Sequence, residues 1–272
     1  MCRHLGLCFA LALSTSSLEA HEFWIEPETH QVELGETAAV DLRVGEMLKG
    51  RSYPFLSHKF DSYTLTDQSG TRTLSGNEGD IPSIRYRAET PGLHVIAYHA
   101  RAEEVTFDDF LTFSEYLEEE GHGTAIVRHR ERGLPEIGFT EAYTRNAKAL
   151  IQVGPADPVE ADRVIGLPFE VVARQNPYAM SAANLTVSLL RWGEAAADAQ
   201  IAILQKSDAD TVERRIIRTD AEGNAEVSLA GGGQFLLSAV YLEETRAESG
   251  AVWRSTWASL TFALPVTATE GQ

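Results

Sequence analysis

Apolar and polar residues alternate along much of this chain, and this period of two constrains the fold more than any other feature. From residue 38 the alternating apolar positions are Ala38, Val40, Leu42 and Val44. Successive side chains of a strand point to opposite faces, so the pattern predicts a half-buried strand. Similar runs occur at 93–99, 185–189, 199–204, 225–229, 235–241 and 253–264. The chain is therefore predicted to be mainly β.

The length of the chain favours two β-sandwich domains. About 250 residues follow the predicted export leader, and this is too many for one ordinary sandwich. A linker-like stretch, Gly-Pro-Ala-Asp-Pro, covers 154–158, and a Gly-containing turn starts an apolar strand in each half, at 91–92 and at 231–233. We predict two related sandwich domains at 21–154 and 159–266.

The spacing of the apolar residues changes from two to that of a helix within the first predicted domain. This change predicts a helical insertion at about 106–150. One set of residues at helical spacing is Phe107, Phe110, Leu111, Ser114 and Leu117, and a second is Phe139, Tyr143, Ala147 and Leu150. Thr106 is the expected N-cap of the first piece, and Gly121 stands where a helix would stop.

The first twenty residues have the pattern of a secretory signal peptide. A short basic start precedes the apolar run from Leu5 to Leu13, and a small polar segment ends at Ala20. Both cysteines, Cys2 and Cys8, lie in this leader, so metal binding in the mature chain would rest on nitrogen and oxygen donors. We predict export to the periplasm.

The net charge of −17 narrows the choice of partners. So acidic a surface argues against nucleic acid and anionic membranes as partners. No stretch after the leader approaches the roughly 20 apolar residues of a transmembrane helix. The mature chain has no cysteine, and it contains neither a nucleophile-elbow serine nor a phosphate-cradling glycine loop, so we do not expect an enzyme.

Cleavage after Ala20 would make His21 the first mature residue, and this predicts a metal chelate. A terminal histidine offers its free α-amine and its imidazole Nδ1 to one ion, and imidazole suits copper, nickel and zinc. His99, at the end of the strand that starts at Leu93, is the first candidate for a second ligand. His58 follows an irregular stretch that can fold over the same sheet edge, whereas Glu22 is expected to point to the other face of its strand.

Three further groups of residues are expected to be structural. The acidic run 118–120 before His122 is interpreted as the solvated end of a surface helix, where a histidine also suits the helix dipole. His30 is expected at the surface. Trp253 and Trp257 share one face of a strand and are expected to pack in the core.

Several segments in order along the mature chain resemble the periplasmic DUF4198 family. These segments are HEFWIEP, FSEYLEEEG, YTRNAKALIQVG, GLPFEVVARQNPY, RTDAEGNAEVSL and AVWRSTWASLTFALP. The resemblance implies exported immunoglobulin-like or prealbumin-like β-domains. It also implies a link to nickel and cobalt uptake, in which relatives act with transport systems.

The resemblance also points to Glu46. Some relatives carry a histidine after the second strand in a Gly-His-x-Phe-Pro setting, where this chain has Gly45-Glu46-Met47-Leu48. Glu46 would then supply a carboxylate in place of the imidazole.

These observations lead to one principal function and two alternatives. We expect a periplasmic transition-metal-binding accessory protein for uptake or homeostasis, with the ion held by His21 and with His99, His58 and Glu46 as candidate ligands. Nickel or cobalt follows from the resemblance, whereas copper or zinc also fits the donors. The partner would be a metal transporter of the inner or outer membrane. The alternatives are a metal-free interaction or carbohydrate-binding module, and a copper-dependent oxidase or monooxygenase.

Overall fold

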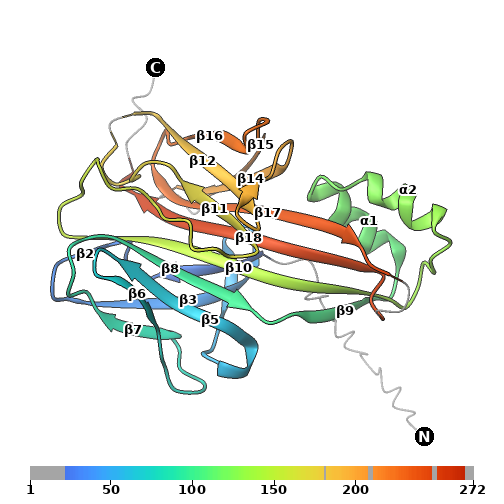
Figure 1. Cartoon of the computed structure of the whole chain (residues 1–272), viewed down its shortest axis with the longest axis horizontal. Coiled ribbons are helices and arrows are strands. Elements are labelled where there is room, and N and C mark those ends of the chain that lie inside the picture. The colour runs from blue at the N-terminus through green and yellow to red at the C-terminus, as the bar shows by residue number, and fades with distance from the viewer. Residues whose placement is uncertain (1–21, 181, 208–210, 247–249, 267–272) are drawn as a thin grey trace, which may run out of the picture.

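The structure is a computed structural model that describes residues 22–180, 182–207, 211–246 and 250–266. It confirms a mainly β chain: the described part contains eighteen strands and two α-helices, arranged in one long sheet and two smaller sheets (Figure 1). No helix in these ranges is long and apolar enough to cross a membrane. The leader and His21 lie outside the described residues.

The central sheet contains strands from both predicted halves of the chain. Its strand order is β15 (Val212–Arg218), β14 (Gln200–Lys206), β17 (Gly233–Glu244), β18 (Trp253–Leu264), β10 (Phe139–Val153), β8 (Gly92–Ala100), β5 (Phe60–Asp67) and β6 (Gly70–Thr73). The short strands β2 (Gln31–Val32) and β9 (Glu103–Phe107) also pair with β10. The parallel pair β10–β18 joins the two halves, so the expected boundary at 154–159 falls between strands that share one sheet.

A smaller sheet covers each face of the central sheet. The N-terminal sheet consists of β1 (Glu22–Pro27), β3 (Thr37–Glu46), β4 (Lys49–Tyr53) and β7 (Ile84–Arg87). The C-terminal sheet consists of β11 (Phe169–Ala173), β12 (Asn184–Arg191), β13 (Glu194–Ala195) and β16 (Asn224–Ser228). The alternating strand predicted at 38–44 is confirmed as the middle of β3.

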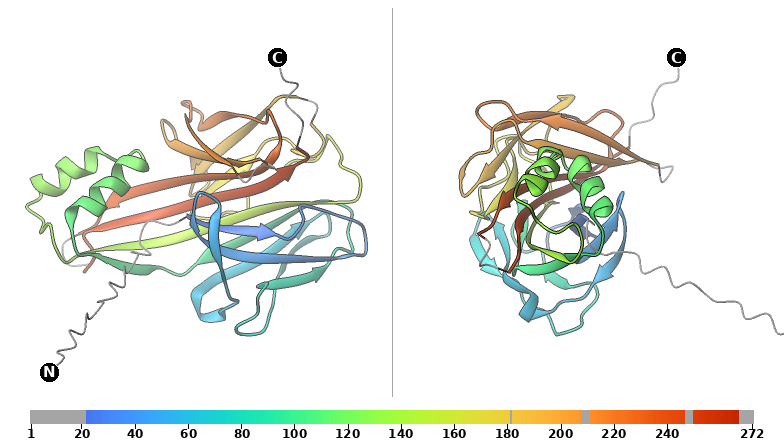
Figure 2. Two further views of the ribbon diagram at one scale, coloured as in Figure 1. Left: turned by 180° about the vertical axis from the view of Figure 1, so that it is seen from behind. Right: turned by 90° about the vertical axis from the view of Figure 1, so that its right-hand side faces the viewer.

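Alternation along β18 shows how the layers are stacked. Ala258, Leu260 and Phe262 pack into the core beneath the C-terminal sheet. The intervening Ser259 and Thr261 point the other way, and their hydroxyls donate to backbone carbonyls of β1 at 2.8 and 2.5 Å. The chain is thus a three-layer β-structure in which a smaller sheet packs on part of each face of the central sheet, as the end-on view in Figure 2 shows.

The predicted helical insertion is shorter than expected and ends earlier. Helix α1 covers Phe110–Glu119, and Asp109, not Thr106, caps it by accepting a hydrogen bond from the Thr112 amide at 2.7 Å. A second helix, α2 (Thr124–Glu131), follows, with a short 3-10 turn, η1 (Ser57–Lys59), elsewhere in the chain. Residues 139–150 were predicted to be helical, and this was wrong because they form most of β10. Both faces of that strand are buried over its second half, so its apolar residues do not alternate.

The two helices pack against one end of the central sheet (Figure 2). Their aromatic residues form a cluster with Trp253 and Trp257 of β18, which are buried as predicted. Within it Tyr116 stacks on Trp257 at 5.8 Å between ring centroids. This packing fixes the C-terminal end of α1 relative to the sheets.

A buried lysine on β10 fastens the C-terminal sheet to the central sheet. Lys148 is 1% exposed, and its ammonium donates to Asp162 at 2.8 Å and to Glu170 at 3.4 Å. It also donates to the carbonyls of Arg163 and Val171. Burial raises the pKa of Asp162. Removing only one partner of an ion pair so far from water strongly destabilises the folded protein.

We therefore expect Lys148→Met to lower the free energy of unfolding by about 3–5 kcal/mol, because two carboxylates would remain buried without a cation. Lys59→Met is the matched control. Lys59 pairs with Glu103, but the two side chains are 36% and 33% exposed, so its loss should cost less than about 1 kcal/mol. Urea unfolding of both variants measures the difference. Equal losses in the two variants would show that the buried lysine does not hold the layers together.

Candidate functional site

Four glutamates gather where the described chain begins. Glu22 is the first residue of β1 and pairs with Gly45, which places Glu46 at the same sheet edge. The end of α1 brings Glu119 and its C-cap Glu120 to this edge, where the charges of Glu119 and Glu46 raise the pKa of Glu22. We call Glu22, Glu46, Glu119 and Glu120 the acidic junction.

Two carboxylates of the acidic junction titrate near neutral pH. Burial is the largest cause and raises the pKa of Glu22 and of Glu120 to about 7 in each case, with neighbouring glutamates adding to the effect. The Oε2 atom of Glu22 is buried, and no hydrogen-bond partner for it exists in the described part of the chain. The junction therefore holds buried negative charge that a cation would stabilise.

Arg214 of β15 provides partial compensation. Its Nε lies 3.4 Å from Glu119 Oε1, and its Nη2 lies 4.0 Å from Glu120 Oε1. Its Nη2 also donates to the backbone carbonyl of Glu119 at 3.0 Å. This arginine touches the helix-end glutamates and lowers the pKa of Glu120.

A tight hairpin positions Glu46. Glu46 pairs with Lys49, and the two residues between them, Met47 and Leu48, have φ values of 52° and 55°. Side chains other than glycine or asparagine seldom adopt this left-handed region. Leu48 is held there because it is buried against Trp24, which anchors the hairpin tip to β1. The hairpin thus fixes Glu46 beside the start of the chain.

The structure brings Glu46, but neither His99 nor His58, to the start of β1. Tyr98 and Phe23 pack together at 5.2 Å in the core beneath the N-terminal sheet, so the next residue along β8, His99, points to the opposite face. There its Nδ1 lies 2.7 Å from Asn146 Oδ1. His58 is exposed on η1, and Glu78 is the charged group near it.

Two of the residues expected to be structural lie in other environments than predicted. Glu120 was expected to be solvated, but its side chain is only 11% exposed because the end of α1 packs against the sheets. His30 was expected at the surface, but it is 9% exposed and its Nδ1 lies 3.1 Å from the Leu150 carbonyl oxygen. Burial lowers the pKa of His30 to about 4. His122 is half-buried, and its Nε2 donates to the Val240 carbonyl at 2.9 Å.

Within the described ranges, no three His, Cys, Asp or Glu side chains come close enough to hold one metal ion. A site at the acidic junction would therefore need donors from the preceding residue. His21 lies outside the described residues and is joined to Glu22 by one peptide bond. Its amine and imidazole would supply two donors, so one or two carboxylates would complete a coordination shell of three or four.

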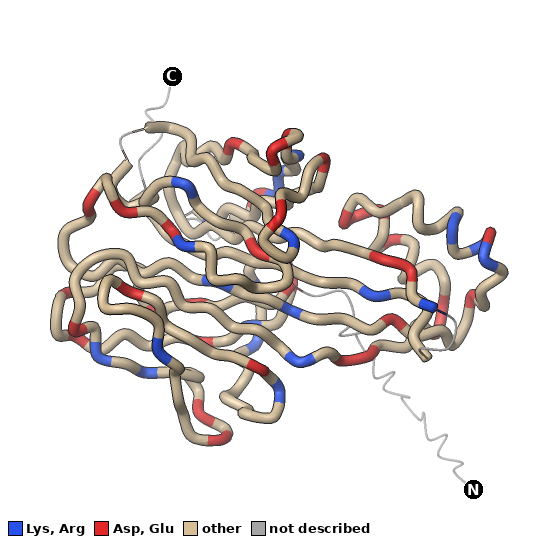
Figure 3. Tube along the Cα trace, viewed as in Figure 1, with Lys and Arg blue, Asp and Glu red and all other residues tan. Residues whose placement is uncertain are grey.

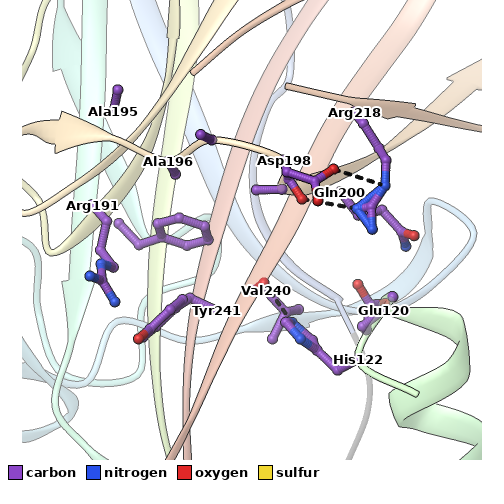
Figure 4. A pocket seen from close by; sticks show the side chains of 14 residues that line it. Glu120, His122, Arg191, Ala195, Ala196, Asp198, Gln200, Arg218, Val240 and Tyr241 are labelled. Atoms are coloured by element: carbon purple, nitrogen blue, oxygen red, sulfur yellow. Dashed lines mark hydrogen bonds and ion pairs between the residues drawn. The ribbon is translucent and has the colours of Figure 1, made fainter. Parts of the chain in front are cut away.

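Two hollows lie on either side of an arginine stacked on a tyrosine, and Glu120 of the acidic junction lines the first of them. One of about 360 Å³ lies between the end of α1, the 195–199 loop and β17, and the other of about 250 Å³ lies over β10 and β18. Arg191 and Tyr241 line both, with the guanidinium carbon 4.2 Å from the ring centroid (Figure 4). Asp198 and Arg218 pair across the first hollow at 3.6 Å.

A family model described as "Domain of unknown function (DUF4198)" matches residues 18–243. The chain belongs to the DUF4198 family. No curated protein matches this DUF4198 chain. A solved structure titled as a tetra-tandem repeat in the extending region of a large adhesion protein is 12% identical to it, with a TM-score of 0.22. The alignment covers 90% of this chain and 49% of the other, so the chain spans about half of that protein, and a similarity so low carries no argument.

The sequence of this DUF4198 member gave only weak signals for the residues that the structure brings together. The triplet Arg191-Trp192-Gly193 favours a hairpin, because a glycine follows a strand. Nothing in this local pattern indicates that Trp192 is exposed at the tip of the hairpin. Tyr241 reads as one more residue of an apolar strand. The closeness of Glu120 to Glu22 depends on how α1 docks, and no local pattern reports such docking.

The raised pKa values of the buried glutamates predict that their contribution to the free energy of unfolding of this DUF4198 protein falls as the pH rises. In the native state Glu120 keeps its proton to about pH 7, whereas in the unfolded chain it loses the proton near its ordinary pKa of 4.5. The contribution of Glu120 to the free energy of unfolding is therefore fully present below about pH 4.5 and is lost as the pH rises through about 7. Glu120→Gln should therefore stabilise the protein by about 1–3 kcal/mol at pH 8 and change little at pH 4.5.

Urea unfolding at both pH values, in the presence of EDTA, measures this difference. Glu115→Gln, at an exposed position on the same helix, is the control and should leave the pH dependence unchanged. Glu141 is also buried with a pKa of about 7, but it contributes equally to wild type and variant. A Glu120→Gln protein with the wild-type pH dependence would contradict the buried, protonated state of this carboxyl.

Proposed function

We propose that this DUF4198 protein is a periplasmic accessory protein that binds one divalent transition-metal ion at its mature N-terminus. His21 supplies the α-amine and the imidazole, and carboxylates of the acidic junction supply oxygen donors. The observation that carries the proposal is the buried Glu22 carboxylate, whose Oε2 has no hydrogen-bond partner in the described chain and which lies one peptide bond from His21. The ion is the protein's cargo, for uptake or homeostasis together with a membrane transporter.

The residues of the acidic junction fit a cation in charge and in chemistry. Glu22 has a pKa of about 7 because it is buried among like charges, and a bound divalent ion would favour its ionised form. Carboxylate oxygen and imidazole nitrogen are both donors that nickel, cobalt, copper and zinc accept. The resemblance of the sequence to uptake-linked relatives favours nickel or cobalt among these ions.

The general acidity of the protein supports cation binding only in part. Asp and Glu occur along the whole trace, on loops and strand ends of every layer (Figure 3). Such a distribution attracts cations weakly and without specificity. The acidic junction differs because two of its carboxylates are largely buried, so they would bind an ion at short range in a less polar environment.

Loss of the free amine or of the Glu22 carboxylate should weaken metal binding. We expect the chain that begins at His21 to bind about one equivalent of Ni²⁺ or Cu²⁺ in calorimetric titration at pH 7.5. An added alanine before His21 removes the free amine, and Glu22→Gln removes a carboxylate. Each change should weaken binding by at least the roughly 10–100-fold that loss of an outer-shell partner costs.

Glu28→Gln is the matched control, because Glu28 is exposed just beyond the end of β1. Affinity in this variant should equal that of the wild type. Binding should also weaken below about pH 7, since protons compete for the amine and for Glu22. Equal affinity in the alanine-extended chain and the chain that begins at His21 would overturn the proposal.

A further inference from the structure

The C-terminal sheet covers only part of the face of the central sheet on which it packs. Leu237 and Leu260 lie beneath it and are fully buried. Further along the same face, Glu243 and Thr256 instead line the open hollow of about 250 Å³. The border between the two regions is Tyr241, which is partly buried. The uncovered part of this face is therefore polar and accessible.

Arg191 and Tyr241 line both hollows, and we call the two hollows together the groove; Figure 4 shows the first hollow with this pair. Arg191 is the last residue of β12, and its guanidinium carbon lies over the Tyr241 ring, 4.2 Å from the ring centroid. Among the residues that the structure describes, none accepts a hydrogen bond from this guanidinium or forms an ion pair with it. Stacking orients its N–H donors before any ligand arrives, and their fork geometry matches a carboxylate.

The acidic residues of the groove already have basic partners, and Glu120 lies 4.0 Å from the Arg214 guanidinium. Asp198 pairs with Arg218 at 3.6 Å, and its backbone carbonyl accepts from the same arginine at 3.0 Å. The Glu243 carboxylate lies 3.5 Å from Arg254. Asp61, at the far end, accepts from Arg101 at 3.0 Å. The charge of Arg191 is thus available to an anion although the protein as a whole is acidic.

An exposed tryptophan stands at the rim of the same groove. Trp192 is the first turn residue of the β12–β13 hairpin, with φ at 52°, and its side chain is 74% exposed. A turn with positive φ at this position favours Asn or Asp, and a bulky residue there is strained. Nothing in the core holds Trp192 in place, unlike Leu48 in the similar hairpin of the N-terminal sheet. Strain of this kind, kept at a surface position, is typical of binding sites.

We propose that this groove binds an acidic saccharide, whose carboxylate pairs with Arg191 and whose sugar ring packs against Trp192. Exposed aromatic rings offer an apolar face with little loss of conformational entropy, which suits the C–H face of a sugar. The floor of the second hollow presents the hydroxyls of Thr144 and Thr256 and the imidazole of His99, which can bond to sugar hydroxyls. Glu120 of the acidic junction lines the first hollow, whereas Trp192 lines the second, so the proposed saccharide contacts do not require a bound metal ion.

Calorimetric titration of the full mature protein in EDTA tests the proposal. The probes are trigalacturonate, an oligomannuronate and sialyllactose, with the methyl ester of trigalacturonate and inorganic phosphate as comparisons. At least one acidic glycan should bind, and Arg191→Met should weaken it about tenfold or more, as expected for hydrogen bonds between charged groups. The corresponding neutral ester should bind as weakly to wild type as the acid does to the variant.

Trp192→Asn separates a binding role from a structural one. Asn-Gly suits a turn with positive φ, so this variant should melt at or above the wild-type temperature and yet bind the glycan about threefold or more weakly. Arg130→Met, a change of an exposed arginine on α2, is the control and should bind like the wild type. The proposal is overturned if none of the three acidic glycans binds, if Arg191→Met or Trp192→Asn binds them as the wild type does, or if phosphate binds as tightly as the glycans.

Discussion

Packing of a smaller sheet on each face of the central sheet is the constraint on which the rest of this structure depends. One set of side chains on β10 and β18 packs towards the N-terminal sheet, and the alternate set packs towards the C-terminal sheet. Each small sheet has a hydrophobic face that needs this partner. The parallel pairing of β10 with β18, which crosses both halves of the chain, therefore supports two cores at once. Lys148 adds a polar anchor between layers that are otherwise held by apolar contacts.

This layering also places both candidate sites. Hydroxyls of β18 hold β1 through its backbone, which fixes the position of Glu22. The helical insertion packs on the end of the central sheet and delivers Glu120 to the same place. On the opposite face the C-terminal sheet is too short to cover the strands beneath it, so its hairpin at Trp192 overhangs an exposed, polar surface. The metal site and the ligand groove meet at Glu120, which lines the first hollow, whereas Arg191 and Trp192, which would contact the saccharide, belong to the β12–β13 hairpin.

The sequence was informative where neighbouring residues determine the structure and uninformative where distant segments meet. Alternation correctly predicted β3, and the pairing of Glu22 with Gly45 is consistent with the expected position of Glu46. Residues 139–150 were read as a helix because a strand buried on both faces lacks the period of two. Helix α2 was missed because few of its residues are apolar, and its buried residues are Ala125 and His129.

The candidate site was predictable only in part for the same reason. His99 does end a strand, as expected, but which face it occupies depends on the pairing of β8 within the central sheet. Glu120 was read as solvated because the docking of α1 cannot be inferred from its acidic end. Arg191 and Tyr241 are 50 positions apart, and their stacking follows from the packing of two different sheets.

X-ray absorption spectroscopy of the nickel-loaded or copper-loaded protein, processed to begin at His21, is the most direct test of the proposed metal site. We expect a first shell of nitrogen and oxygen donors with the multiple-scattering signal of a single imidazole, and oxygen donors that decrease when Glu22 is replaced by Gln. A signal from two or more imidazoles, or a spectrum that is the same when an extra residue precedes His21, would contradict a site built from the N-terminal histidine and the acidic junction.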